Sequence, residues 1–123
     1  MSAKFLAGKN IAMKVPSHQY EATVHFYRNI LGFEPVTGPS GNATGFKFGD
    51  KNLWIDNVPG MSQAEIWLEV ITNDTKEAAR LLENAGIARC DEIENLGEKF
   101  DGFWISSPSS IIHLIDAESG SWE

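Results

Sequence analysis

His113 and Glu65 are the two residues of this sequence best suited to proton transfer or metal binding. His113 lies in a predicted strand between apolar neighbours, and Glu65 begins another strand after a connector rich in turn-forming residues. An imidazole titrates near neutral pH and ligates metals, and a carboxylate can act with it as acid or base. Two plainer roles stay open: a core histidine satisfied by one hydrogen bond, and an exposed carboxylate at a strand end.

Three tryptophans lie in predicted strands and would present large flat surfaces. Trp54 shares a strand face with Asp56, and Trp67 shares one with Glu65, because side chains alternate between the two faces of a strand. Such side chains usually pack in a core. On the inner face of a curved sheet they would also line a pocket, and with Trp104 they favour a flat or aromatic ligand.

Other reactive motifs are absent from the sequence. Cys90 is the single cysteine, and its neighbours Asp91 and Glu92 disfavour a thiolate, so we expect it to be inert. The sequence contains no Ser–His–Asp arrangement, phosphate-binding loop, dinucleotide fingerprint or CxxC pair.

The charge of the chain excludes some classes of partner. The formal net charge is -7 and the basic residues are scattered, whereas a nucleic-acid surface needs a basic stripe. No stretch is long and apolar enough to span a bilayer, and the first ten residues do not resemble a secretory signal. A lone thiol fits a reducing compartment. We therefore expect a cytoplasmic protein that binds neither nucleic acid nor membranes.

The first half of the sequence predicts one strand, one helix and three further strands. Residues 11–15 alternate as a strand that Pro16 ends, and Ser17 is suited to cap a helix over residues 18–31 that Gly32 terminates. The strands that follow are predicted over residues 33–37, 45–48 and 53–56, before a connector over residues 57–60.

The second half repeats this order. Residues 65–70 alternate as a strand, and Asp74 with Glu77 has the spacing of a capping box at the start of a helix that Gly86 ends. Three strands are predicted next, over residues 87–93, 100–105 and 111–115.

The two halves can be aligned, and in this alignment Trp54 corresponds to His113. The sequence therefore predicts an α+β fold in which two βαβββ modules form cupped mixed sheets around a cavity. We expect a single domain over residues 8–118, with modules at 8–57 and 63–117. The alternative is two unrelated halves of an α+β sandwich, such as a ferredoxin-like domain.

Two segments resemble the signatures of a known superfamily. Residues 26–33 read FYRNILGF, and residues 107–114 read SPSSIIHL, one residue shorter than the usual last-strand pattern. They resemble the vicinal oxygen chelate superfamily, which includes glyoxalase I, bleomycin-resistance proteins and extradiol dioxygenases. The likeness covers residues 10–116. It implies the βαβββ fold more strongly than any one chemistry.

The resemblance also implies where a metal would bind. Members that use a metal hold a divalent ion with His and Glu or Gln residues from the first and last strand of each half. By register, these positions are occupied here by Asn10, Trp54, Glu65 and His113. Asn10 is a poor ligand and Trp54 cannot be one, so we do not expect a divalent metal held by the full set of four ligands. Asp56, on the face of Trp54, is the alternative third ligand.

Three functions are consistent with these residues. The first is a metal-free, small-molecule-binding protein of the bleomycin-resistance type, with Asn10, Trp54, Asp56, Trp67 and Trp104 lining its pocket. The second is a metal-dependent lyase, isomerase or dioxygenase that uses Glu65 and His113. The third is an enzyme without a metal in which those two residues act as base and acid. The resemblance also implies a homodimer.

Overall fold

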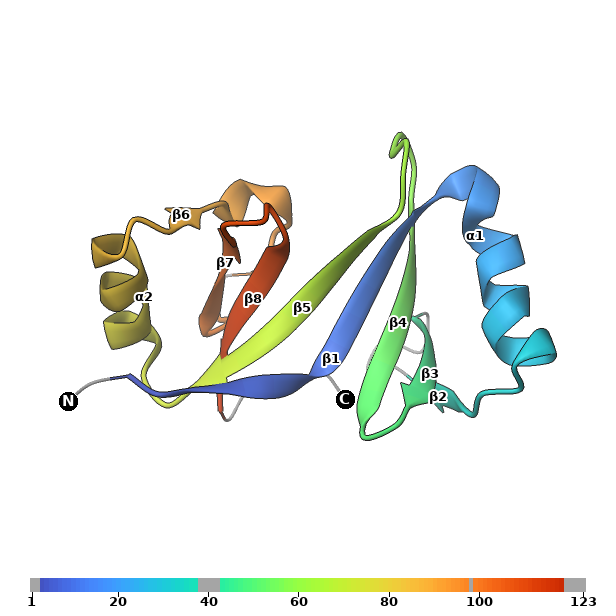
Figure 1. Cartoon of the computed structure of the whole chain (residues 1–123), viewed down its shortest axis with the longest axis horizontal. Helices are drawn as coiled ribbons and strands as arrows, with labels where there is room; N and C mark the ends of the chain where they lie inside the picture. The colour runs from blue at the N-terminus through green and yellow to red at the C-terminus, as the bar shows by residue number, and fades with distance from the viewer. Residues whose placement is uncertain (1–2, 38–42, 98, 119–123) are drawn as a thin grey trace. The chain divides into compact units, whose positions relative to one another are not determined.

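A computed structural model describes residues 3–37, 43–97 and 99–118 of the chain, which divides into two units (Figure 1). The N-terminal unit comprises Lys9–Trp67. The C-terminal unit begins at Leu68 and also includes the start of the chain up to Gly8. No helix among the described residues has the length and apolar character needed to cross a membrane.

The N-terminal unit is a mixed sheet with strand order β2–β3–β4–β1. β1 and β4 are parallel, whereas the other two pairs are antiparallel. A π-helical segment, η1, continues α1. The elements are β1 (Phe5–Pro16), α1 (Ser17–His25), η1 (Phe26–Ile30), β2 (Pro35–Thr37), β3 (Thr44–Phe48) and β4 (Lys51–Val58).

The C-terminal unit repeats this arrangement with strand order β5–β8–β7–β6. β5 and β8 are parallel, and the remaining pairs are antiparallel. The elements are β5 (Glu65–Thr72), α2 (Thr75–Asn84), β6 (Ala88–Arg89), a 3₁₀ turn η2 (Asp91–Ile93), β7 (Gly102–Ser106) and β8 (Ile112–Ala117). The predicted α+β class and the repeated βαβββ order are confirmed.

Each helix covers the apolar face of its own sheet (Figure 1). In the N-terminal unit, Val24 of α1 packs with Val15, Phe46, Leu53 and Ile55. In the C-terminal unit, the corresponding buried cluster consists of Ala78 of α2 with Phe103, Ile105 and Ile115. Because strand side chains alternate, every second residue of these strands lies on the opposite face, away from the helix.

The two helices begin differently. Asp74 caps α2 as predicted, since its Oδ1 accepts a hydrogen bond of 3.0 Å from the amide of Glu77. The prediction for Ser17 is wrong: Pro16 is the N-cap of α1, and the Ser17 hydroxyl instead donates to Asn57 Oδ1 at 2.6 Å. Gly32 and Gly86 follow the helical segments with φ of 72° and 81°, as expected of glycines that end a helix.

The predicted strand over residues 87–93 is wrong beyond Arg89. The Cys90 amide still donates to the Trp104 carbonyl at 3.0 Å. After it, Oδ1 of Asp91 accepts the Trp104 amide at 2.9 Å, while Oδ2 binds Arg89. A side chain thereby takes the place of a backbone acceptor, and the chain turns into η2.

β1 begins six residues before its predicted start at Ile11. Its first residues belong to the C-terminal unit, where the Lys4 amide donates to Asn73 Oδ1 at 2.8 Å. Gly8 lies so close to Glu69 that a Cβ there would clash with the Glu69 carboxylate. The residues of this part of the strand are mostly exposed and do not alternate between apolar and polar. Hydrophobic periodicity therefore does not predict a strand there.

Replacing Asp74 by alanine should lower the free energy of unfolding by about 1 kcal/mol, because the Glu77 amide would lose its acceptor. Urea denaturation followed by circular dichroism measures this change. Asp50→Ala, at an exposed turn between β3 and β4, is the matched control and should change stability by less than about 0.5 kcal/mol. Equal effects of the two substitutions would contradict the assigned cap.

Candidate functional site

The face of the N-terminal sheet that points away from α1 carries polar side chains. The parallel register pairs Asn10 with Asn52 and Lys14 with Asp56, which puts both pairs on the same side as Trp54. Three of these side chains, those of Asn10, Lys14 and Asn52, belong to buried residues. We use the name polar face for seven residues: Asn10, Asn52, Lys14, Asp56 and Trp54, together with Trp67 and Glu65 of β5.

Asn10 and Trp54 form the first contact of the polar face. Trp54 Nε1 donates to Asn10 Oδ1 at 2.7 Å, and Asn52 Nδ2 lies 3.4 Å from the same oxygen. The indole lies against Gly45 of β3, where a Cβ would be only 2.5 Å from Trp54 Cε3. Only glycine leaves room at this position for the Trp54 ring to lie on the sheet.

Lys14 is the centre of the polar face. Its Nζ lies 2.8 Å from Asp56 Oδ2 and 4.3 Å from the centroid of the Trp67 ring. The Lys14 side chain is 7% exposed, whereas that of Asp56 is 35% exposed. The ammonium group is therefore held between a carboxylate and an aromatic ring, which both compensate a positive charge removed from water.

Trp67 connects Lys14 to the second carboxylate. Its Nε1 donates to Glu65 Oε1 at 2.9 Å, and Glu65 itself is exposed. Asp56, Lys14, Trp67 and Glu65 thus form a continuous series of charged and aromatic contacts. Of the residues predicted for the site, five lie in the N-terminal unit: Asn10, Trp54, Asp56, Glu65 and Trp67.

Sequence reasoning missed Lys14 and Asn52. Lys14 follows Asn10 at a spacing of four in the same strand, so strand alternation alone places the two on one face. That signal was present in the sequence. The contact of Lys14 with Trp67 was not, because it joins residues far apart in the chain.

The C-terminal unit holds the other two predicted residues, His113 and Trp104. His113 pairs with Ile105 and Leu68, and so lies on the side of the sheet that α2 covers. Its Nδ1 is 3.0 Å from the Ile111 carbonyl. Trp54 lies on the side away from its helix, so the predicted equivalence of His113 with Trp54 is wrong: the two residues lie on different faces of their sheets.

Trp104 lies on the opposite face of the same sheet, paired with Leu114. It is buried, and its Nε1 donates to the Glu94 carbonyl at 3.0 Å. This hydrogen bond satisfies the polar end of the indole within the C-terminal unit.

The residues present do not fit the metal site that the superfamily resemblance implies. Asn10 Oδ1 accepts the Trp54 indole N–H, and an indole nitrogen offers no lone pair to a metal. Asp56, the alternative ligand, is paired with Lys14. Within residues 3–37, 43–97 and 99–118, no three His, Cys, Asp or Glu side chains gather in a group able to hold a metal ion.

Cys90 has an environment that disfavours its reactive form. Burial, followed by the carboxylates of Glu92 and Asp91, raises the pKa of the thiol above its ordinary value. Less thiolate is therefore present at neutral pH than for a free cysteine, which agrees with the expectation of an inert thiol.

Asp56→Ala should destabilise the protein by about 1–3 kcal/mol, because it leaves the buried Lys14 ammonium without its carboxylate. Lys14→Met should cost less, since a methionine side chain keeps the apolar contact with Trp67. Both are measured by urea denaturation. The reverse order of the two effects would contradict the view that removing the Asp56 carboxylate from a buried ammonium group dominates the loss.

No family model matches the chain, and no curated protein does. Solved structures do match it. A Mn(II)-bound glyoxalase from Novosphingobium aromaticivorans is 17% identical with a TM-score of 0.64, over 94% of this chain and 40% of that one. Homoprotocatechuate 2,3-dioxygenase from Brevibacterium fuscum, as an E323L mutant, is 15% identical with a TM-score of 0.63, over 99% of this chain and 35% of that one.

A third structure has nearly the length of this chain. It is a glyoxalase/bleomycin resistance protein/dioxygenase superfamily member from Vibrio splendidus 12B01, 15% identical with a TM-score of 0.53, over 88% of this chain and 97% of that one. By contrast, the chain spans about two fifths of the Novosphingobium glyoxalase. Together with the repeated βαβββ topology, these matches show that the chain has the vicinal oxygen chelate fold found in these glyoxalase and dioxygenase structures.

Proposed function

We infer that this protein binds a small planar molecule at the polar face of the N-terminal unit, without the four-ligand metal site that the superfamily resemblance implies. The observation that carries this proposal is the position of Lys14, a buried cation held between Asp56 and Trp67. The shared fold supports only the general class, since one fold serves many chemistries.

The buried polar side chains of the polar face lower the stability that this sheet could have. The other face of the same sheet is an ordinary apolar core against α1. A lysine and two asparagines buried on the polar face contribute less to stability than apolar residues of similar size would. Ligand sites characteristically contain a small number of placed polar side chains, because these fix the orientation of the ligand.

The groups still accessible on this face indicate the chemistry of the ligand. The carboxylates of Asp56 and Glu65 are more exposed than the lysine and can accept hydrogen bonds from a ligand. Trp67 is itself buried, and its indole N–H holds the exposed Glu65 carboxylate in place. A planar ligand with hydroxyl or amine donors would use the two carboxylates.

His113 does not enter this proposal, because its side chain lies on the α2 side of its own sheet. Glu65 remains the residue on the polar face best suited to exchange a proton with a ligand, since it is exposed and oriented by Trp67. The proposal is therefore binding, with any turnover depending on Glu65.

Titration of the protein with a panel of one-ring and two-ring phenols and arylamines, followed by tryptophan fluorescence and calorimetry, tests the proposal. We expect saturable binding of one molecule per chain. Lys14→Met should weaken it at least tenfold, because the substitution releases Asp56 and alters the surroundings of Trp67. Trp67→Phe should remove most of the fluorescence response.

Lys76→Met is the matched control, because Lys76 is exposed on α2 in the C-terminal unit. It should leave the affinity unchanged. Equal affinities for the wild type and Lys14→Met would contradict the proposed face. A stoichiometric divalent ion in the purified protein, lost on Glu65→Ala, would favour a metal-dependent lyase, isomerase or dioxygenase instead.

The homodimer and the cytoplasmic location expected from the sequence remain part of this proposal. Phe26, Ile30 and Leu31 expose large apolar side chains at the end of the first helical segment. Adjacent exposed apolar residues of this kind are typical of surfaces that contact another protein.

A further inference from the structure

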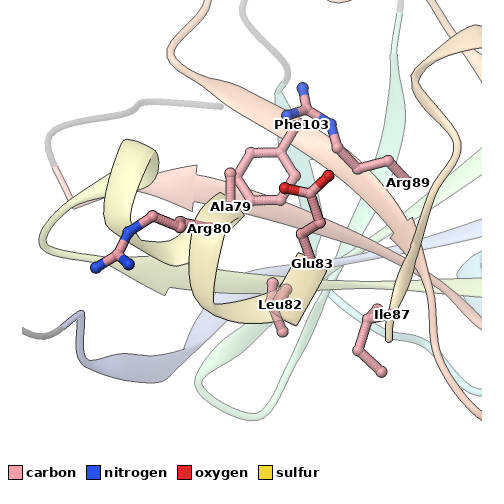
Figure 2. A pocket seen from close by; sticks show the side chains of 7 residues that line it. All are labelled: Ala79, Arg80, Leu82, Glu83, Ile87, Arg89 and Phe103. Carbon is pink, nitrogen blue, oxygen red and sulfur yellow. The ribbon is translucent and has the colours of Figure 1, made fainter. Parts of the chain in front are cut away.

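A groove of about 290 Å³ lies in the C-terminal unit, between α2 and the β6–β7 edge of the sheet (Figure 2). Leu82, Ile87 and Phe103 supply its apolar surface. Glu83, Arg80 and Arg89 contribute charged side chains. Its volume is near the lower end of the range for small-molecule sites, so it suits a compact ligand.

Both arginines of the groove already have carboxylate partners. Arg89 binds Asp91 Oδ2 through Nε at 2.8 Å and Nη2 at 2.7 Å, with its guanidinium carbon 4.6 Å from the centroid of the Phe103 ring. Arg80 Nε donates to Glu77 Oε2 at 3.0 Å, and its Nη2 makes a further contact with Oε1. The positive charge of the groove is thus balanced by residues of the protein itself.

Glu83 is the exception. Among the described residues its carboxylate has no ion-pair or hydrogen-bond partner. In Figure 2 this carboxylate points toward the Phe103 and Arg89 side of the groove, whereas the guanidinium of Arg80 points away from it. One negative charge therefore remains uncompensated beside an apolar surface.

We propose that this groove binds a small organic cation, with its ammonium group at Glu83 and its apolar body against Leu82, Ile87 and Phe103. A charge of -7 on the whole chain favours the approach of a cation as well. The site lies in the unit that does not hold the polar face, so it is independent of the function proposed above.

Three probes that share a phenethyl group and differ in charge test the assignment: phenethylammonium, 2-phenylethanol and 3-phenylpropanoate. Each is titrated into ¹⁵N-labelled protein at low ionic strength, and amide shifts are followed by NMR. Phenethylammonium should shift the amides of Leu82, Ile87 and Phe103 in a saturable way. The neutral probe should bind more weakly, and the anion more weakly still.

Glu83→Gln should weaken phenethylammonium by about two- to fivefold, because a single exposed ion pair contributes little. Glutamine retains helix propensity, so α2 should persist. Glu21→Gln, on the exposed surface of α1, is the matched control and should leave the affinity unchanged. Equal binding of the three probes, no saturable shift at these amides, or no effect of Glu83→Gln would each overturn the proposal.

Discussion

The parallel pairing of β1 with β4 is the constraint on which the N-terminal unit depends. Parallel neighbours cannot be joined by a tight turn, so α1, β2 and β3 are placed in the connection between them. The register, from Asn10 opposite Asn52 to Pro16 opposite Val58, then decides which side chains face α1. Because this register applies along both strands, the apolar side chains lie on the face toward α1. Lys14, Asp56 and Trp54 lie on the other face.

The polar face shows how a buried charge is tolerated within one sheet. The carboxylate of Asp56 and the π face of Trp67 both compensate the charge of Lys14. Ion pairs of this kind rarely add stability compared with apolar residues of the same size, because both charges lose water. This cost in stability is the reason for proposing the polar face as a binding site.

The C-terminal unit repeats the topology with different chemistry. β5 and β8 pair in parallel as β1 and β4 do, and α2 covers the corresponding face. Its short edge strand β6 ends where Asp91 replaces a backbone acceptor, and the groove of Glu83 opens beside that edge. Equivalent scaffolds thus carry a buried cation in one unit and an uncompensated carboxylate at the surface of the other.

The sequence by itself determined the class of fold, the repeat, the cap at Asp74 and the glycines after both helical segments, because these depend on local spacing and backbone conformation. Tertiary structure decided the early start of β1, the end of β6 and the face of His113. The reason is that strand register depends on partners distant in the chain, and a shift of one residue moves every side chain to the opposite face. For the same reason, Lys14 emerged as the centre of the polar face only when Asp56 and Trp67 were placed beside it.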